Sequence, residues 1–323
     1  MKALDYKTLQ KEVLDLYRTG GGNTFYLGFK ALEAHYNIKA GSCTDWTGYP
    51  GSGKSELLFE ILMNTNEYYG HKHLLYMPDA GTNAEVAAKL LHKLTGKQFN
   101  EHYYSNEGQK VKITNRLSEL DIMNYLGRIH ETFVFLDIEQ SDRKSKSITP
   151  VEFWEYAVKN KKELGIFSAV IDSWNYMRHD TEGKREDKWL EEVLSYRNIL
   201  AEDSGLHFHT IIHPKSAVKT RDGEVVPPTY HDLKGGSEWS NNGKSIVIVH
   251  RDAGSNVAQI NIAKAKPAIV GIQGEATLSY DLSKGRYYEN VGGADNTGVK
   301  KYAEKKPIDE YMISDSIKPN LDF

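Results

Sequence analysis

Short apolar runs alternate with amphipathic segments along most of the chain. The apolar runs are rich in Val, Ile, Leu and Phe and are bounded by Gly, Pro, Asp or Ser, which indicates buried strands. Between them, apolar positions recur with helical spacing. The expected strands cover residues 42–48, 71–81, 131–139, 166–174, 206–214 and 244–252, and the expected helices cover 54–70, 82–96, 150–165 and 186–205. This alternation predicts an α/β fold with a mostly parallel, twisted sheet flanked by helices.

The two ends of the chain depart from the alternation. After residues 257–266 the pattern changes to strand and turn in residues 274–289, which predicts antiparallel strands at the C-terminal edge of the sheet. Residues 3–19 form an amphipathic helix that the glycines of residues 19–23 separate from the rest. Its apolar stripe could pack on its own domain or on a neighbouring subunit. The expected organisation is therefore a linker helix with a glycine hinge (1–23), a main domain (24–290) and a polar, mobile tail (291–323).

Composition narrows the class of protein. The chain has 323 residues, 39% of them hydrophobic, and a net charge of −3, which is typical of a soluble globular protein. A single cysteine, Cys43, allows no internal disulfide and favours a reducing cytoplasm. The chain shows neither a long apolar run nor a signal peptide, so we expect no membrane partner. The weak net charge does not exclude nucleic acid, because an acidic ring can have a basic channel.

The segment "WTGYPGSGKSE" carries the clearest chemistry. Gly48 and the Gly53-Lys54-Ser55 triplet have the spacing of a phosphate-binding P-loop, set between an expected strand and an expected helix. Glycines let backbone N–H groups curl around phosphate oxygens, and the helix N-terminus adds partial positive charge. In such a loop the lysine reaches the outer phosphates and the serine binds Mg²⁺. The sequence therefore predicts an ATP site made by Gly48, Pro50, Gly51, Ser52, Gly53, Lys54 and Ser55.

A P-loop ATPase also needs carboxylates near the phosphates. Asp137 and Asp172 both close apolar runs, and either could complete the magnesium shell, although the longer buried run favours Asp172. Asp79, at the end of the strand after the P-loop helix, is the candidate for orienting the attacking water. The histidines of "LHFHTIIHP", His207, His209 and His213, lie on one face of a strand, but no acid or cysteine completes a metal site there.

These motifs occur in a recognisable order. "GFKALEAHYNIKAGSCTDWTGYPGSGKSE", "AVIDSWNYMRHD", "TIIHPKS", "PPTYHDLKGGSEWSNNGKSIVIVHRD" and "AKAKPAIVGIQGEATLSYD" resemble, in order, the blocks of the RecA-like ATPase domain of DnaB-type replicative helicases. The likeness is to the Twinkle-like and phage primase-helicase branch, and it spans about residues 24–290. It implies a ring, a hexamer in this family, that surrounds single-stranded DNA and binds ATP with Mg²⁺ between subunits.

The resemblance assigns roles to individual residues. It selects Asp172 over Asp137 for the magnesium, places His213 at the γ-phosphate sensor and favours docking of helix 3–19 on a neighbour. It puts two loops in the DNA channel, where phosphate contacts suit movement that is independent of base sequence. The residues of those loops are Lys215, Lys219, Arg221, Lys234 and Gly235. The N-terminal segment is too short for a primase domain, so we expect a separate primase or polymerase partner.

Two positions depart from the family pattern. The family has Glu where this chain has Asp79, and an arginine finger where this chain has the "KAK" of Lys264 and Lys266. A shorter carboxylate holds water less well, and lysine lacks the planar fork that grips a phosphoryl group. Slow hydrolysis, a shifted register at the site, or a ring that mainly binds nucleotide would each follow.

Three functions therefore remain open. The first is an ATP-driven DNA translocase and replicative helicase of a bacterial, possibly phage-encoded, cytoplasmic system. The second is an ATP-binding scaffold with weakened hydrolysis in a replication or packaging complex. The third is a RecA-like recombinase that forms open filaments, since one fold serves both rings and filaments. A metabolite kinase is the weakest alternative, because the polar loop 215–243 does not suit a closed small-molecule pocket.

Overall fold

The structure, a computed structural model, describes residues 3–18, 24–105, 107–137, 148–217, 225–291 and 294–296. Its helices are α1 (Tyr6–Arg18), α2 (Lys30–Glu33), α3 (Lys54–Tyr69), α4 (Asn83–Thr95), α5 (Glu119–Thr132), α7 (Pro150–Leu164), α8 (Glu186–Ser204) and α9 (Gly236–Asn242), with 3-10 turns η1 (Trp174–Tyr176), η2 (Tyr230–Asp232) and η3 (Ala268–Val270). Its strands are β1 (Thr24–Phe25), β2 (Ile38–Lys39), β3 (Cys43–Thr47), β4 (Lys72–Tyr76), β5 (His102–Tyr104), β6 (Lys110–Lys112), β7 (Phe133–Phe135), β8 (Ile166–Asp172), β9 (His207–Ile212), β10 (Ser245–His250), β11 (Val257–Ala265), β12 (Gly274–Asp281), β13 (Arg286–Val291) and β14 (Ala294–Asn296).

One mixed sheet organises the chain. Its strand order is β14-β13-β12-β11-β10-β3-β9-β8-β4-β7. The pairs from β10 to β7 are parallel, and those from β10 to β14 are antiparallel. The predicted α/β class, the parallel sheet and the antiparallel C-terminal edge are confirmed. Because the P-loop strand β3 lies in the middle, the carboxyl ends of β4, β8 and β9 meet beside it.

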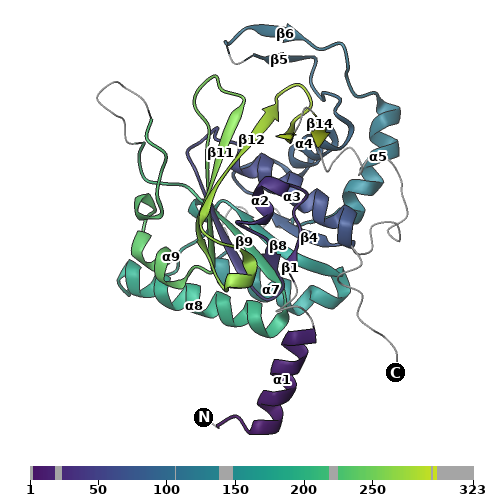
Figure 1. The fold of residues 1–323 in the computed structure, drawn as a ribbon. Coiled ribbons are helices and arrows are strands. Elements are labelled where there is room, and N and C mark those ends of the chain that lie inside the picture. Colours follow the sequence, from purple (N-terminus) through teal and green to yellow (C-terminus); the bar gives the residue numbers. More distant parts are fainter. Residues whose placement is uncertain are drawn as a thin grey trace, which may run out of the picture.

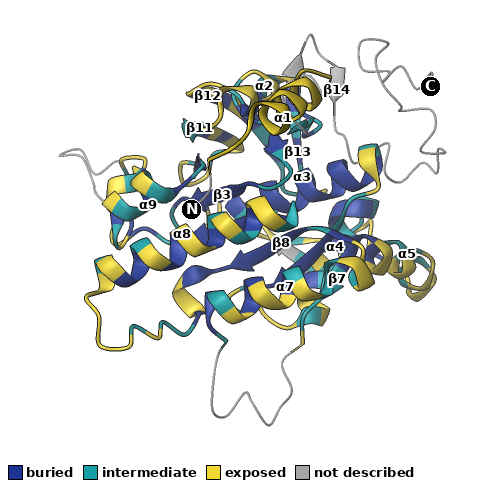
Figure 2. Cartoon of the chain, turned by 90° about the horizontal axis from the view of Figure 1, so that it is seen from below, coloured by how far each residue is buried: buried dark blue, intermediate teal, exposed yellow. Residues whose placement is uncertain are grey.

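Helices cover both faces of the sheet (Figures 1 and 2). The apolar sides of α2, α3, α4 and α5 belong to one buried cluster, and those of α7, α8 and α9 belong to a second cluster on the other face.

Local signals fix the helix ends. Thr82 and Thr149 cap α4 and α7 through reciprocal capping boxes with Glu85 and Glu152, and Gly96 ends α4 in the left-handed conformation.

The sequence did not reveal how residues 97–132 are organised. They form the β5–β6 hairpin and the helix α5, which runs to Thr132. The strand expected at 131–139 is therefore shorter at its start, and β7 covers only Phe133–Phe135 at the end of the sheet. A helix and strand that abut without a glycine or proline between them leave little signal in the pattern.

Helix α1 forms as expected and has no buried residue. It projects from the body in Figure 1, with Leu9, Val13 and Leu16 exposed.

The expected tail begins later than residue 291, because Ala294–Asn296 pair with β13 as strand β14; residues 297–323 lie outside the described residues. In the described part of the chain, no helix is both long enough and apolar enough to cross a bilayer.

Candidate active site

The P-loop joins the carboxyl end of β3 to the N-terminus of α3 and follows the geometry that its motif predicts. Gly48 and Gly53 have φ angles of 156° and 92°. A Cβ at Gly48 would overlap the carbonyl oxygen of Val249, and one at Gly53 would overlap the hydroxyl of Tyr287. Only glycine fits both positions, so the loop can turn its amides towards a phosphate. Pro50 and Gly51 form the exposed part of the same loop, and Ser52 is buried within it.

Lys54 and Ser55 begin α3 and meet Asp172 from the end of β8. The Ser55 hydroxyl donates a 2.6 Å hydrogen bond to Oδ2 of Asp172. Burial raises the pKa of Asp172, while the Ser55 hydrogen bond and the Lys54 ammonium act to lower it. Burial also lowers the pKa of Lys54, against the carboxylates of Asp172 and Asp79. Asp137 follows the edge strand β7, whereas β8 is separated from β3 only by β9, and this explains why Asp172 reaches Ser55.

Asp79 and His213 approach the same point from the ends of β4 and β9. Their atoms Oδ2 and Nε2 lie 3.3 Å apart. The backbone N–H of Asp79 donates to the carbonyl of Asp172, and that of His213 donates to Oδ1 of Asn175. Burial and the Lys54 ammonium lower the pKa of His213, and the Asp79 carboxylate opposes them. A hydrogen bond to Asp79 raises the pKa of Tyr176.

Three of these side chains form a group that could bind a cation. One ligand atom each from Asp79, Asp172 and His213 lies within 4.8 Å of the others. His213 lies with Asp79 and Asp172, in agreement with the nucleotide roles expected for all three, whereas His207 and His209 contact Thr44 and Trp46. The buried hydroxyls of Thr47, Ser52 and Ser173 have no hydrogen-bond partner. Carboxylates and unpaired hydroxyls around a glycine loop are the donor set that suits Mg²⁺ and a triphosphate.

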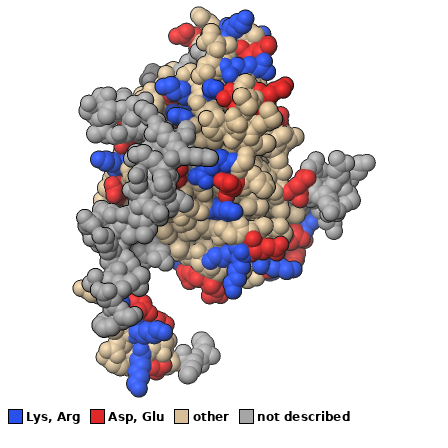
Figure 3. All heavy atoms as spheres, turned by 90° about the vertical axis from the view of Figure 1, so that its right-hand side faces the viewer, with Lys and Arg blue, Asp and Glu red and all other residues tan. Residues whose placement is uncertain are grey.

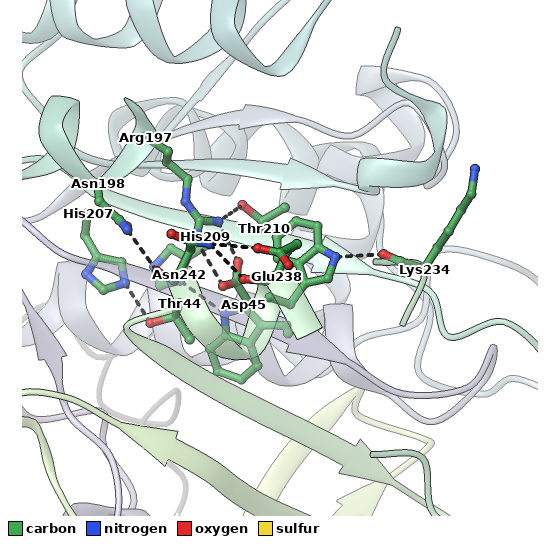
Figure 4. A network of polar contacts seen from close by, with 12 residues as sticks. Thr44, Asp45, Arg197, Asn198, His207, His209, Thr210, Lys234, Glu238 and Asn242 are labelled. Atoms are coloured by element: carbon green, nitrogen blue, oxygen red, sulfur yellow. Dashed lines mark hydrogen bonds and ion pairs between the residues drawn. The ribbon is translucent and has the colours of Figure 1, made fainter. Parts of the chain in front are cut away.

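His207 and His209 have structural roles. His207 lies 2.9 Å from the Thr44 hydroxyl, and Trp46 Nε1 donates to His209 Nδ1 at 3.2 Å. Burial lowers the pKa of His207 to about 4. Both histidines belong to the buried polar network of Figure 4 rather than to the P-loop group.

The same network contains a buried ion pair between Arg197 of α8 and Asp45 of β3. Two hydrogen bonds, of 2.5 and 3.0 Å, join the guanidinium to the carboxylate. The helical pattern placed only the aliphatic stem of Arg197 in the core, yet the whole side chain is buried. Trp239 of α9 lies beside this guanidinium, and its indole N–H donates to the carbonyl of Lys234. The ion pair therefore supports the segment that leads into α9 (Figure 4).

Three residues that sequence reasoning missed surround the P-loop. Arg251 donates a 2.9 Å hydrogen bond to the carbonyl of Gly51, and its guanidinium carbon lies 5.2 Å from the ring centre of Tyr280. Tyr287 donates to the carbonyl of Gly53 at 3.1 Å. A cavity of about 880 Å³ opens beside the loop, lined by Tyr49–Ser52, Val225, Pro227, His250–Ser255 and Gln259. The "HRD" at the end of the strand 244–252 was the only sequence signal for Arg251.

Lys264 and Lys266 lie at the opposite end of the sheet from the P-loop. Ala265 pairs with Ser245, which in turn pairs with Thr44 near the start of β3. The Lys264 ammonium donates to the carbonyl of Ser240, and burial lowers its pKa. Lys266 is exposed. Neither lysine meets the phosphate-binding residues of its own chain.

The two expected DNA segments lie side by side beyond β9. A bridge joins Pro214 to Leu233, and the backbone N–H of Lys215 donates to the carbonyl of Asp232. Lys215 is exposed, and Lys234 forms a 2.7 Å ion pair with Glu186.

Gly235 has a φ angle of 74°, and a Cβ there would overlap a methyl group of Leu190, so glycine is required between these segments and α8. Lys219 and Arg221 lie outside the described residues. Figure 3 shows basic and acidic side chains interspersed on the face it presents, as the small net charge suggests.

Comparisons with known proteins agree with this geometry. No family model matches the chain. A curated relative, the "Twinkle homolog protein, chloroplastic/mitochondrial" of Arabidopsis thaliana, is 27% identical over 270 residues, which are 81% of this chain and 36% of the relative. The chain thus spans about a third of the length of that relative.

Two solved structures share the fold. One is described as an isolated ATPase domain, with a TM-score of 0.66 and 14% identity over 88% of this chain and 99% of that one. The other is a DnaB-like replicative helicase described with its interactions with primase, also with a TM-score of 0.66 and 14% identity, over 88% of this chain and 68% of that one. This chain therefore shares its fold with these two structures and is similar in sequence to the Twinkle homolog.

Proposed function

We propose that the chain is an ATP-dependent translocase on single-stranded DNA and a replicative DNA helicase, acting as a ring-shaped oligomer that we take to be a hexamer. The observation that carries this proposal is the meeting of Lys54, Ser55, Asp172, Asp79 and His213 at one edge of the sheet. Together they offer a phosphate-binding lysine, a magnesium site and a base for water. The similarity to Twinkle directs this chemistry towards DNA.

The phosphate and magnesium half of the site follows from the contacts of α3. When bound, Mg²⁺ neutralises the charge that develops on the transferring phosphoryl group. Ser55 and Asp172 lie within hydrogen-bond distance of each other, so their oxygens would together hold the cation. Burial lowers the pKa of Lys54. A bound phosphate would place negative charge beside the ammonium and stabilise its charged form.

Asp79 and His213 form the half of the site that acts on water. Asp79 would orient the water and accept its proton, because its carboxylate lies within 4.8 Å of the magnesium ligand Asp172. Neutral His213 contacts the same carboxylate and lies where a γ-phosphate would be detected. Because His213 also follows β9, a change at the phosphate would reach Lys215 two residues further along the chain.

Lys264 and Lys266 would act on the nucleotide of a neighbouring copy. Because they lie at the far end of the sheet from their own P-loop, they would supply a cation to the site of another subunit. DNA would contact Lys215, Lys234 and the backbone at Gly235 in the channel, with Lys219 and Arg221 assigned to the same loop. Helix α1, which has no buried residue, would dock on a neighbour and hold the ring together.

The direct test is steady-state ATP hydrolysis with and without single-stranded DNA, with Lys54→Ala as the blank. A working motor should hydrolyse ATP faster when DNA is present, and it should separate a forked duplex with ATP and Mg²⁺. A rate equal to the blank, with nucleotide still bound, would contradict the helicase proposal.

A second candidate is an ATP-binding scaffold with weakened hydrolysis in a replication or packaging complex. It is favoured by the contacts of Asp79, whose carboxylate is engaged by His213 and Tyr176. Under this view, the pair Asp79→Glu and Lys266→Arg should greatly raise turnover. No gain from that pair would contradict the scaffold.

A recombinase, the third function considered, would differ from the helicase and the scaffold in the shape of its assembly on DNA. Electron micrographs of the protein on single strands would show closed rings for a helicase and long open filaments for a recombinase. A primase or polymerase partner is part of the helicase proposal, and one of the similar structures is described together with primase.

A further inference from the structure

The β5–β6 hairpin is a regular antiparallel element that has no role in the proposed ATPase cycle. It stands at the top of the molecule in Figure 1, well separated from α9 and the Lys234 segment that precedes it. Its strands pair antiparallel, with His102 opposite Lys112 and Tyr104 opposite Lys110. Directly opposite residues of a hairpin lie on the same face, and so do residues two positions apart on one strand. These four side chains therefore form one face of the hairpin.

That face combines cations with an aromatic ring. Tyr104 is 65% exposed, Lys110 and Lys112 are exposed, and His102 is partly exposed. Neither lysine has an ion-pair partner among the described residues. Unpaired lysines beside an exposed ring offer contacts for a phosphate backbone and a stacking surface for a base.

The base of the hairpin is held in place. Gln98 donates a 2.6 Å hydrogen bond to the carbonyl of Ser283 in the β12–β13 turn. Arg116 donates to the carbonyl of Phe99 at 3.2 Å, and Lys97 forms a 2.8 Å ion pair with Asp121 of α5. These contacts fix the orientation of the hairpin on the domain, so its face is presented in a defined direction.

The hairpin also lies near the catalytic edge. A cavity of about 500 Å³ runs from Asp79 along α4 to Gln98, Phe99 and Asn100 at the start of the hairpin. The base of the hairpin therefore lies on the side of the molecule where ATP would be hydrolysed. It is nevertheless separate from the two segments that carry Lys215 and Lys234.

We propose that the face formed by His102, Tyr104, Lys110 and Lys112 binds single-stranded DNA outside the channel, as a second contact for a strand displaced at a fork. This inference rests on the proposed helicase function. Tyr104 would stack on a base, and the two lysines would each neutralise a phosphate. The contact would be independent of base sequence, since no side chain of this face is buried against a base-reading pocket.

The first test compares the variant Lys110→Ala/Lys112→Ala, alone and with Tyr104→Ala, with wild type on forked DNA. The matched control is Lys159→Ala/Lys162→Ala, which removes two exposed lysines from α7. Removing two phosphate contacts should reduce the slope of log affinity against log salt by about 1.4. Adding Tyr104→Ala should weaken binding of the displaced tail about tenfold. Hydrolysis stimulated by a short oligonucleotide should stay at the wild-type rate.

The second test locates the partner directly. With Tyr104→p-benzoylphenylalanine, irradiation of a fork whose two tails carry different labels should link the protein to the displaced tail. Linkage to the other tail, to the duplex, or to a second protein chain would overturn the proposal, the last in favour of a contact between subunits. Equal fork binding and salt slope in wild type and hairpin variants would overturn it as well. Failure of the wild type to bind any single strand would instead reject the helicase function.

Discussion

The two ends of strand β3 are equipped for different tasks. At its carboxyl end lie the P-loop and a group of candidate catalytic side chains from the ends of three other strands. Near its amino end, β11 carries Lys264 and is followed by Lys266, and no phosphate-binding loop occurs beside these lysines in the described residues. The P-loop end also holds Arg251, whereas the opposite end offers two lysines. The difference supports the proposal that the lysine end of one copy serves the P-loop of another.

The largest effect should come from breaking the P-loop end. Asp172→Asn removes the charge that would hold magnesium beside Ser55 and should lower kcat about 10²–10³-fold. Asp137→Asn is the matched control, since Asp137 follows the edge strand, and its kcat should stay within about twofold of wild type. Hydrolysis assays over a range of Mg²⁺ concentrations would check both. Equal losses in the two variants would remove the distinction between these acids.

The opposite end should fail in a way that a second subunit can repair. Lys266→Ala should lower kcat by about 10–10³-fold, because the developing phosphoryl charge loses a cation. A ring assembled from equal amounts of Lys266→Ala and Lys54→Ala subunits should regain activity. About a quarter of its interfaces would then pair an intact P-loop with an intact Lys266, by random assembly. No recovery in rings verified to be mixed would mean that the two ends do not cooperate.

Between the two ends, the Asp45–Arg197 pair should affect stability. Arg197→Met leaves the buried Asp45 carboxylate without its partner, and the free energy of unfolding should fall by about 3–5 kcal/mol. Asp45→Leu combined with Arg197→Met removes both charges and should restore much of that loss. Urea unfolding monitored by tryptophan fluorescence would measure it. A double variant less stable than the single one would show that the network does more than neutralise charge.

The smallest effect concerns pH at the P-loop end. Burial lowers the pKa of His213 below its ordinary value of about 6.5, so the ring is neutral at neutral pH. The rate of hydrolysis should therefore stay constant near neutral pH and decline only below about pH 6.5. At that acidity protonated His213 would pair with Asp79 and draw its carboxylate away from the water. His213→Gln should abolish this acid limb of the kcat profile. An acid limb that persists unchanged in His213→Gln would assign the titration to another group.

The sequence predicted the features that depend on local pattern. The parallel order, the P-loop and the choice of Asp172 follow from apolar runs and from motifs read in sequence order. The resemblance implied that Asp79, Asp172 and His213 lie near the nucleotide, but the direct contact of His213 with Asp79 depends on which strands are neighbours, and spacing along the chain does not contain that information.

Other features were missed because their residue types have a more common use. Arg197 lies on an amphipathic helix, where arginine usually exposes its head, so its complete burial could not be inferred. Arg251 and Tyr287 reach the P-loop from strands that the pattern assigned to the sheet alone. Residues 97–132 contain a turn glycine, Gly108, and a helix cap, Ser118, but the two strands of their hairpin have only three residues each, which is too short to show a period.

The hydrogen bond from Tyr287 to Gly53 has a consequence for how the protein is made. It joins residues that are 234 positions apart, and the Tyr287 backbone N–H also bonds the buried Glu60 of α3. During synthesis the P-loop emerges long before the strand that packs against it. We therefore expect nascent chains that stop before β13 to fold their parallel strands while binding nucleotide poorly. The ability to bind ATP would then mark a chain that has been made through β13, and a shorter nascent chain would not enter a ring in its nucleotide-bound form.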